Sequence, residues 1–242
     1  MKLKVAALVL TVCCIALAAQ QAAKPAATPV EMTAEPSHHL KIDNEYVRAF
    51  YVEIAPGQST LQHHHPNDYI AIAFGPAQVD SVSSDGQVRH IAFEEGQVFF
   101  APAGLVHAAT NRGTTVFRNA TIELLQNQGH PVCVDHCEND PRAKDWPTLP
   151  PSAKPIGYGD TFRISLVTVK PQQPIPTDDP FPHMAIFLTD TEIDGGPGAV
   201  GGNVKHSAYE MQFHKPHPDL NLKNTGQNDV RIIAIQFKPV MK

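Results

Sequence analysis

The chain has 242 residues, of which 19 are Lys or Arg and 24 are Asp or Glu, so its formal net charge at pH 7 is −5. This mild acidity, with no basic run, argues against nucleic acid and anionic membranes as partners. The length allows one large β domain or two small ones.

The N-terminus has the pattern of a secretory signal peptide over residues 1–18. Lys2 and Lys4 precede an apolar run that is shorter than a membrane span, and Ala16-Leu17-Ala18 provides a small-residue cleavage site. The pattern predicts export to the periplasm or the extracellular space, with no membrane attachment after cleavage. A retained single-pass anchor is the alternative. Residues 19–36 are rich in Ala and Pro and are expected to form a tether.

Short apolar runs separated by Gly, Pro, Asn and Asp predict an all-β fold. Helical periodicity is nearly absent, and the turn residues recur at a spacing typical of an antiparallel barrel or sandwich. Asp85-Gly86 fits a hairpin turn. The expected strands of the first half are Val47–Ile54, Tyr69–Phe74, Ala77–Ser81, Val88–Phe93, Gln97–Ala101 and Val116–Leu125.

Two clusters of Gly, Pro and His carry the strongest signal. The segment Gly96–Asn111 reads GQVFFAPAGLVHAATN, and upstream of it Gly57 is followed by His63-His64-His65 and by Gly75. These residues resemble the two signature motifs of the cupin family. The segment satisfies every fixed position of the second motif, G(X)5PXG(X)2H(X)3N, whereas the first motif lacks its glutamate. The resemblance implies a jelly-roll β-barrel that holds a metal ion.

Three histidines of these motifs are the predicted metal ligands. Alternate side chains of a strand point to opposite faces, so His63 and His65 point one way and His64 the other. His107 would supply the third imidazole from a partner strand. Three imidazoles suit one divalent transition metal (Fe, Mn, Zn, Ni, Co or Cu) and leave positions open for water or substrate. The alternative is that the triple-His run is only a surface metal trap.

The fourth ligand of the family is missing. A glutamate should follow the second histidine by four or five residues, where this sequence has Tyr69 or Ile70. Tyr69 shares the parity of His65, whereas Asp68 has the better chemistry and the opposite parity. We therefore expect a three-histidine site with Asp68 or Tyr69 as an accessory group, in a largely apolar lumen. The sequence identifies no catalytic residue beyond the metal ligands.

The second half of the chain repeats the first weakly. Residues 47–58 align with 162–173, and residues 117–124 align with 230–237 at nearly the same offset. Self-similarity of this kind indicates a duplicated architecture. The resemblance thus extends to a bicupin, an all-β protein of two tandem jelly-roll barrels. A single barrel with a long C-terminal appendage is the alternative.

These alignments divide the chain into a metal-binding cupin domain at 37–126, a connector at 127–157 and a degenerate cupin-like domain at 158–242. The second domain has lost the metal chemistry, because the positions of the three ligands hold Asp178, Pro180 and Leu220. We expect it to serve packing or subunit contact, and its His206, His214 and His217 to be surface residues rather than metal ligands.

Cys133 and Cys137 are the only cysteines outside the predicted leader. In an oxidising compartment this pair most simply forms a disulfide that closes a small loop. A metal site of both thiolates with His136 is the alternative, but it would be short of ligands.

The resemblance implies an exported metal-binding protein, with a dioxygenase or an isomerase of a small organic molecule as the candidate enzymes. A non-catalytic barrel that binds or senses a small ligand is the alternative, and a purely structural exported protein is the third. A small molecule is the expected partner, and the architecture is compatible with a homodimer.

Overall fold

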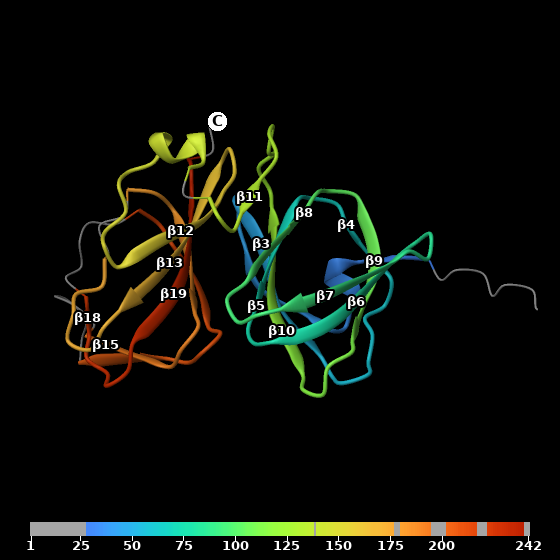
Figure 1. Ribbon diagram of the computed structural model, residues 1–242, viewed down its shortest axis with the longest axis horizontal. Coiled ribbons are helices and arrows are strands. Elements are labelled where there is room, and N and C mark those ends of the chain that lie inside the picture. The colour runs from blue at the N-terminus through green and yellow to red at the C-terminus, as the bar shows by residue number, and fades with distance from the viewer. Residues whose placement is uncertain (1–27, 138, 177–179, 195–201, 217–221, 240–242) are drawn as a thin grey trace, which may run out of the picture.

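The structure, a computed structural model, describes residues 28–137, 139–176, 180–194, 202–216 and 222–239. Within these ranges two β-barrels lie side by side (Figure 1). The only helices there are two short 3-10 segments, η1 (Met32–Ala34) and η2 (Pro141–Asp145). None is long and apolar enough to cross a membrane. The all-β prediction with two barrels is therefore confirmed, while the predicted signal peptide and residues 19–27 lie outside the described ranges.

The first barrel consists of two five-stranded sheets with the orders β1-β4-β9-β6-β7 and β2-β3-β10-β5-β8. All six strands of the expected list are present, two of them with the expected bounds, and β1, β2, β4 and β9 are additional to that list. The strands are β1 (Val30–Glu31), β2 (His38–Asp43), β3 (Val47–Ile54), β4 (His63–His65), β5 (Tyr69–Ala73), β6 (Ala77–Ser83), β7 (Val88–Phe93), β8 (Val98–Ala101), β9 (Leu105–Asn111) and β10 (Phe117–Leu124).

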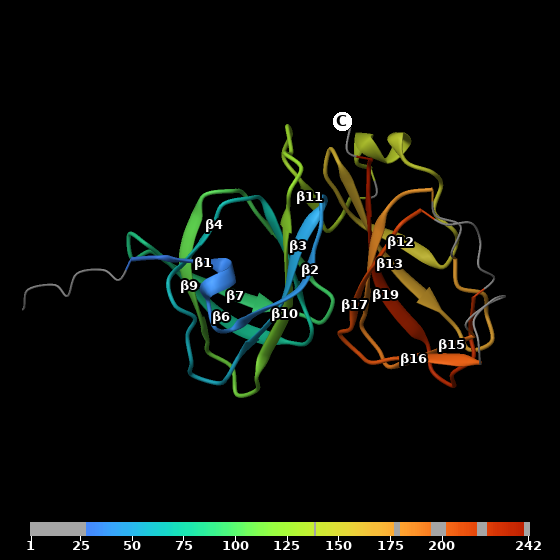
Figure 2. The ribbon, with the colours of Figure 1, turned by 180° about the vertical axis from the view of Figure 1, so that it is seen from behind.

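The predicted end of the tether at residue 36 is wrong. β1 pairs with β4, and η1 contacts β2 and β4. Figure 2 shows this short helix, in blue, against the first barrel. Met32 and Glu35 are each only 2% exposed, and Met32 packs with Phe50 inside the barrel. The prediction of a tether rests on the average composition of residues 19–36. An average of this kind does not reveal that two individual side chains, Met32 and Glu35, are buried by the barrel.

The second barrel consists of a six-stranded sheet, β11-β12-β13-β19-β14-β17, and a three-stranded sheet, β16-β15-β18. The connector contributes β11 and β12 to the larger sheet, so its predicted boundary at residue 157 falls inside this barrel. The strands are β11 (Cys133–Val134), β12 (Ala153–Tyr158), β13 (Phe162–Val169), β14 (His183–Phe187), β15 (Thr191–Asp194), β16 (Asn203–His206), β17 (Met211–His214), β18 (Lys223–Asn224) and β19 (Val230–Phe237).

The internal repeat is visible as the same pair of antiparallel strands in each barrel. In the first barrel β3 pairs with β10 so that Arg48 lies opposite Glu123. In the second barrel β13 pairs with β19 so that Arg163 lies opposite Gln236. In both barrels the arginine donates a hydrogen bond to the facing side chain. Matching registers with matching side-chain contacts are expected of a duplicated barrel.

A buried asparagine closes the same corner of each barrel. Asn111 Nδ2 donates to the carbonyls of Ile54 and Thr115, and its Oδ1 accepts from Gly113 N. Asn224 makes the equivalent three bonds in the second barrel, with Val169, Asn228 and Gly226. The last residue of the second motif therefore holds a turn and does not face a ligand.

The largest hydrophobic cluster lies between the two barrels rather than inside either one. Alternate residues of β3, β5 and β10 point out of the first lumen and pack against the outward residues of β13, β14 and β19. Because these sheets are buried on both faces, their strands read as nearly continuous apolar runs. The cluster includes the fully buried Ile70, Ile72, Ile122, Ile164, Ile186, Ile233 and Ile235.

Candidate metal centre

Three histidines from facing strands converge in the first barrel. On β4, His63 and His65 are each 1% exposed, whereas His64 lies on the other face and is partly exposed. The pairing of β4 with β9 places His63 directly opposite His107. The ring centroids are 4.7 to 5.1 Å apart, and one nitrogen from each ring lies within 4.8 Å of the others. The structure thus brings together the three predicted ligands.

The closest pair of ring nitrogens has the spacing expected for coordination of a single ion. His65 Nε2 and His107 Nε2 are 3.1 Å apart. Two nitrogens bonded at about 2.1 Å to one ion, at a right angle, would be about 3.0 Å apart. Among the described residues no other group of three His, Cys, Asp or Glu side chains has a comparable arrangement.

Hydrogen bonds fix the orientation of two of the rings. Ser81 Oγ lies 2.7 Å from His107 Nδ1, and the Leu61 carbonyl lies 2.9 Å from His63 Nδ1. These partners occupy Nδ1 and leave Nε2 of each ring for a ligand. His65 Nδ1 is buried without a partner, and its ring is held by stacking on Tyr69 at 4.0 Å.

Burial keeps the three imidazoles uncharged. Desolvation is the main cause that lowers the pKa of His63 to about 4, of His107 to about 3 and of His65 to about 2. The neighbouring histidines lower these pKa values further, because the rings would repel one another if protonated. At neutral pH each ring is therefore in the form that binds metal ions.

The two candidate accessory residues have other contacts. Asp68 Oδ1 accepts a hydrogen bond from Ala103 N at 2.8 Å, so this carboxylate holds the turn after β8. Tyr69 is 4% exposed, and burial raises the pKa of its phenol, so the ring is a neutral stacking partner of His65. Asp68 is not part of the converging group, which consists of three histidines alone.

A cavity of about 660 Å³ opens from the three histidines into the first barrel. Its walls include Ala71, Val79 and Phe99, whereas Val98 belongs to the cluster between the barrels. The predicted apolar lumen is thus present. Strand parity alone does not reveal which alternate side chains line it, because both faces of β8 are apolar and partly or fully buried.

Comparison with known proteins shows what this geometry resembles. No family profile and no curated protein matches the sequence. Among solved structures, a cupin 2 conserved barrel domain protein from Leptotrichia buccalis matches with a TM-score of 0.50 and 7% identity, over 83% of this chain and 88% of that one. Salicylate 1,2-dioxygenase from Pseudaminobacter salicylatoxidans matches with a TM-score of 0.53 and 10% identity, over 83% and 76%. The chain has the bicupin fold.

A third solved structure, the oxalate decarboxylase of Bacillus subtilis studied for its Mn(II) centres, matches this bicupin with a TM-score of 0.50 and 12% identity, over 85% of this chain and 76% of that one. At these identities the likeness concerns the fold. The histidines on the two facing strands identify this bicupin as metal-binding, with the identity of the ion left open.

One pair of polar residues in the cavity was not predicted from the sequence. His38 lines the cavity, and its ring centroid is 4.8 Å from that of His63. Its Nδ1 lies 2.6 Å from Glu35 Oε2. Burial opposes ionisation of Glu35, but hydrogen bonds from His38 and from the backbone of Leu61 and Ser37 outweigh it and lower the pKa of the carboxyl. No motif marks this pair, since Glu35 falls in the segment assigned to the tether.

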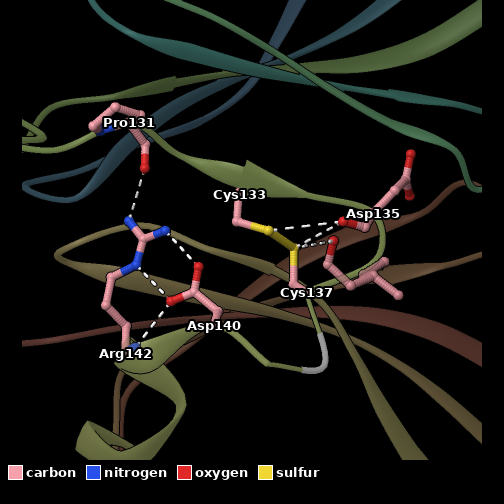
Figure 3. Close-up of a disulfide and its surroundings, with 7 residues drawn as sticks. Pro131, Cys133, Asp135, Cys137, Asp140 and Arg142 are labelled. Atoms are coloured by element: carbon pink, nitrogen blue, oxygen red, sulfur yellow. Dashed lines mark hydrogen bonds and ion pairs between the residues drawn. A yellow bond between two sulfur atoms is a disulfide. The ribbon is translucent and has the colours of Figure 1, made fainter.

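The two cysteines among the described residues, Cys133 and Cys137, form a disulfide, so their thiolates are not available as metal ligands. Cys133 and Cys137 are bonded through their Sγ atoms (Figure 3). Cys137 is 2% exposed. His136 between them is exposed. Arg142 anchors the same loop, since it donates to the carboxylate of Asp140 and to the Pro131 carbonyl (Figure 3).

Proposed function

We propose that the first barrel is the site of a metal-dependent enzyme, a dioxygenase-type oxidoreductase that acts on a small organic molecule. The observation that carries the proposal is the convergence of three uncharged imidazoles on the wall of a 660 Å³ cavity. Three protein ligands leave coordination positions open, as in reactive rather than structural sites. Salicylate 1,2-dioxygenase, which has the same fold, agrees with this class of reaction.

The donor set fits a divalent ion such as Fe, Mn, Zn, Ni, Co or Cu. Such an ion would supply Lewis-acid polarisation of a substrate oxygen, and iron would also activate dioxygen. The role of His63, His65 and His107 is to hold the ion, and Ser81 keeps the His107 ring in place. The cavity walls include apolar side chains such as Phe99, which would exclude water from the bound substrate.

His38 is the side chain that is positioned to move a proton. Glu35 occupies its Nδ1, so the second ring nitrogen is the one available to a molecule in the cavity. A carboxylate that orients a histidine in this way stabilises the ring when it takes up a proton. An isomerase, the other enzyme class under consideration, would also need such a group.

The first experiment measures metal content. Protein purified without a His-tag should contain about one divalent ion per chain, and His107→Ala should reduce this to near zero. His64→Ala is the matched control, because His64 belongs to the same triple-His run but points to the other face. Equal metal loss in both variants, or a full ion in His107→Ala, contradicts the proposed site.

The second experiment separates an enzyme from a binding protein. Oxygen uptake is measured with a panel of catechols, flavonols and thiols, and His107→Ala serves as the blank. A non-catalytic sensing barrel is the second candidate, and it is favoured by the lack of a carboxylate in the histidine group of the described residues. Ligand binding without oxygen uptake or isomerised product would support that candidate.

We further propose that the protein is exported. The disulfide between Cys133 and Cys137 supports this proposal, because such bonds persist in oxidising compartments. Expression in a Gram-negative host with N-terminal sequencing of the periplasmic protein should give a mature chain that starts at Ala19. An uncleaved N-terminus on protein from the cytosol would contradict it.

A further inference from the structure

Among the described residues the second barrel has no group of metal ligands, but the barrel is not filled. A cavity of about 490 Å³ lies in its lumen. Much of the wall is apolar, with Val167, Ile175 and Phe187 among its residues. The expectation that His206 and His214 lie at the surface is wrong, because both are half-buried and line this cavity; His217 lies outside the described ranges. Protein interiors are normally packed without voids of this size, because unfilled space forfeits contacts. A barrel that served only packing or subunit contact would have no need of this space.

Comparison of the two repeats shows where part of this space comes from. On β3, Phe50 lies opposite Thr121 and is fully buried in the first barrel. Ser165 takes the same place in the second barrel, since it lies opposite Ala234 on the equivalent strand pair. An aromatic ring has thus been replaced by a hydroxymethyl group, and its partner threonine by alanine. Both differences reduce the volume that side chains occupy in the second barrel and so leave more of its lumen open.

Ser165 also presents an unsatisfied polar atom to the cavity. The residue is 2% exposed, it lines the cavity, and its Oγ has no hydrogen-bond partner in the structure. A buried hydroxyl without a partner is costly, and such groups usually have a partner that is a water or a ligand. The orphaned hydroxyl therefore marks the point where a bound molecule would be held.

The donors beside Ser165 select the kind of polar group that fits. Arg163 lies two residues away on the same face of β13, lines the cavity and is 3% exposed. Its Nε donates to Gln236 Oε1 and its Nη1 to the Pro147 carbonyl, which hold the guanidinium in position. A guanidinium has donors and no acceptor, so an oxygen acceptor fits at this end of the cavity and an ammonium group does not.

We propose that the second barrel is a separate, metal-independent binding site for a small, mainly apolar organic molecule that carries a carboxylate or carbonyl oxygen. The apolar body occupies the space that Phe50 fills in the first barrel, and the oxygen accepts a hydrogen bond from Ser165. The site is independent of the three histidines of the first barrel.

The chain contains a built-in reporter for this site. Trp146 is the only tryptophan of the sequence. The guanidinium of Arg163 lies 5.3 Å from the centre of its ring, and the next residue, Pro147, lines the cavity. A ligand that contacts Arg163 should therefore change the emission of Trp146.

The test titrates the metal-loaded protein with cyclohexanecarboxylate and with cyclohexylmethylammonium, which have the same body and opposite charge. Trp146 emission and saturation-transfer NMR of the probe are recorded together. The carboxylate should bind saturably and at least about 5-fold more tightly than the ammonium probe, which forgoes the hydrogen bond donated by the Ser165 hydroxyl. Absence of saturable binding in both measurements would mean that the cavity holds only water, and the proposal would be overturned.

Four variants locate the binding. Ser165→Ala should weaken it about 5-fold, the effect of one hydrogen bond, and Ala185→Phe should abolish it by filling the cavity, which Ala185 lines. Ala71→Phe fills the equivalent place in the first barrel and should leave the affinity unchanged, as should the metal-free His107→Ala. Unchanged binding in Ser165→Ala and Ala185→Phe, or loss in Ala71→Phe alone, would overturn the proposal. Far-UV circular dichroism shows whether each variant is folded.

Discussion

Removal of the Ser81 hydroxyl should weaken metal binding without removing any ligand. Ser81 Oγ is the only side-chain atom hydrogen-bonded to a ring Nδ1 of the described histidine group, at 2.7 Å from His107. His107 is 8% exposed, so water has little access to replace the lost partner. Loss of a hydrogen-bonding partner behind a metal-ligating histidine typically costs 10- to 100-fold in affinity. We therefore expect a change in binding free energy of about 1.4 to 2.7 kcal/mol for Ser81→Ala.

The assay is a competition titration of the apoprotein with a metal-loaded chelator, read by isothermal calorimetry. Ser83→Ala is the matched control, because Ser83 lies on the same strand but its hydroxyl bonds Asp85 and the Gln87 carbonyl instead of an imidazole. Equal affinities for Ser81→Ala and the wild type would refute the view that this hydroxyl orients the ring. An equal loss in Ser83→Ala would show that the effect comes from the strand as a whole.

Three further results are expected. Burial raises the pKa of the Glu123 carboxyl above its ordinary 4.5. The contribution of this carboxyl to stability is therefore complete below that pH and is lost as pH rises through the folded pKa, so the urea midpoint of Glu123→Gln relative to wild type should increase between about pH 4.5 and about pH 7.5. A difference between the two midpoints that does not change with pH would be evidence against this shift. Asn111→Ala and Asn224→Ala should each lower the free energy of unfolding by about 3 kcal/mol, because each leaves buried carbonyls without a donor, and a loss in only one of them would contradict the equivalence of the corners. Reduction of the bond between Cys133 and Cys137 should cost about 2 kcal/mol, as expected for so short a loop, while metal content stays constant; loss of metal on reduction would link the two sites.

The three metal ligands could be predicted from the sequence, because the patterns that mark them are local. Strand parity separates His63 and His65 from His64, and the second motif places His107 on a returning strand, so three positions and one rule predict the group. The internal repeat could also be predicted from the sequence. The aligned segments form paired strands with matching registers in the two barrels. The disulfide followed from the number and spacing of the cysteines.

Only the tertiary structure shows the contacts that depend on which faces of the strands and sheets pack together. The pairing of His38 with Glu35 arises because η1 folds back onto the barrel, which composition does not reveal. The choice between Val98 and Phe99 as cavity wall depends on the packing of the second barrel against the first. Ser165 stands where the first repeat has Phe50 and adds space to the lumen of the second barrel. This equivalence becomes visible only when the registers of the two strand pairs are compared. Local patterns set strand and motif positions, whereas burial is a property of the assembled sheets.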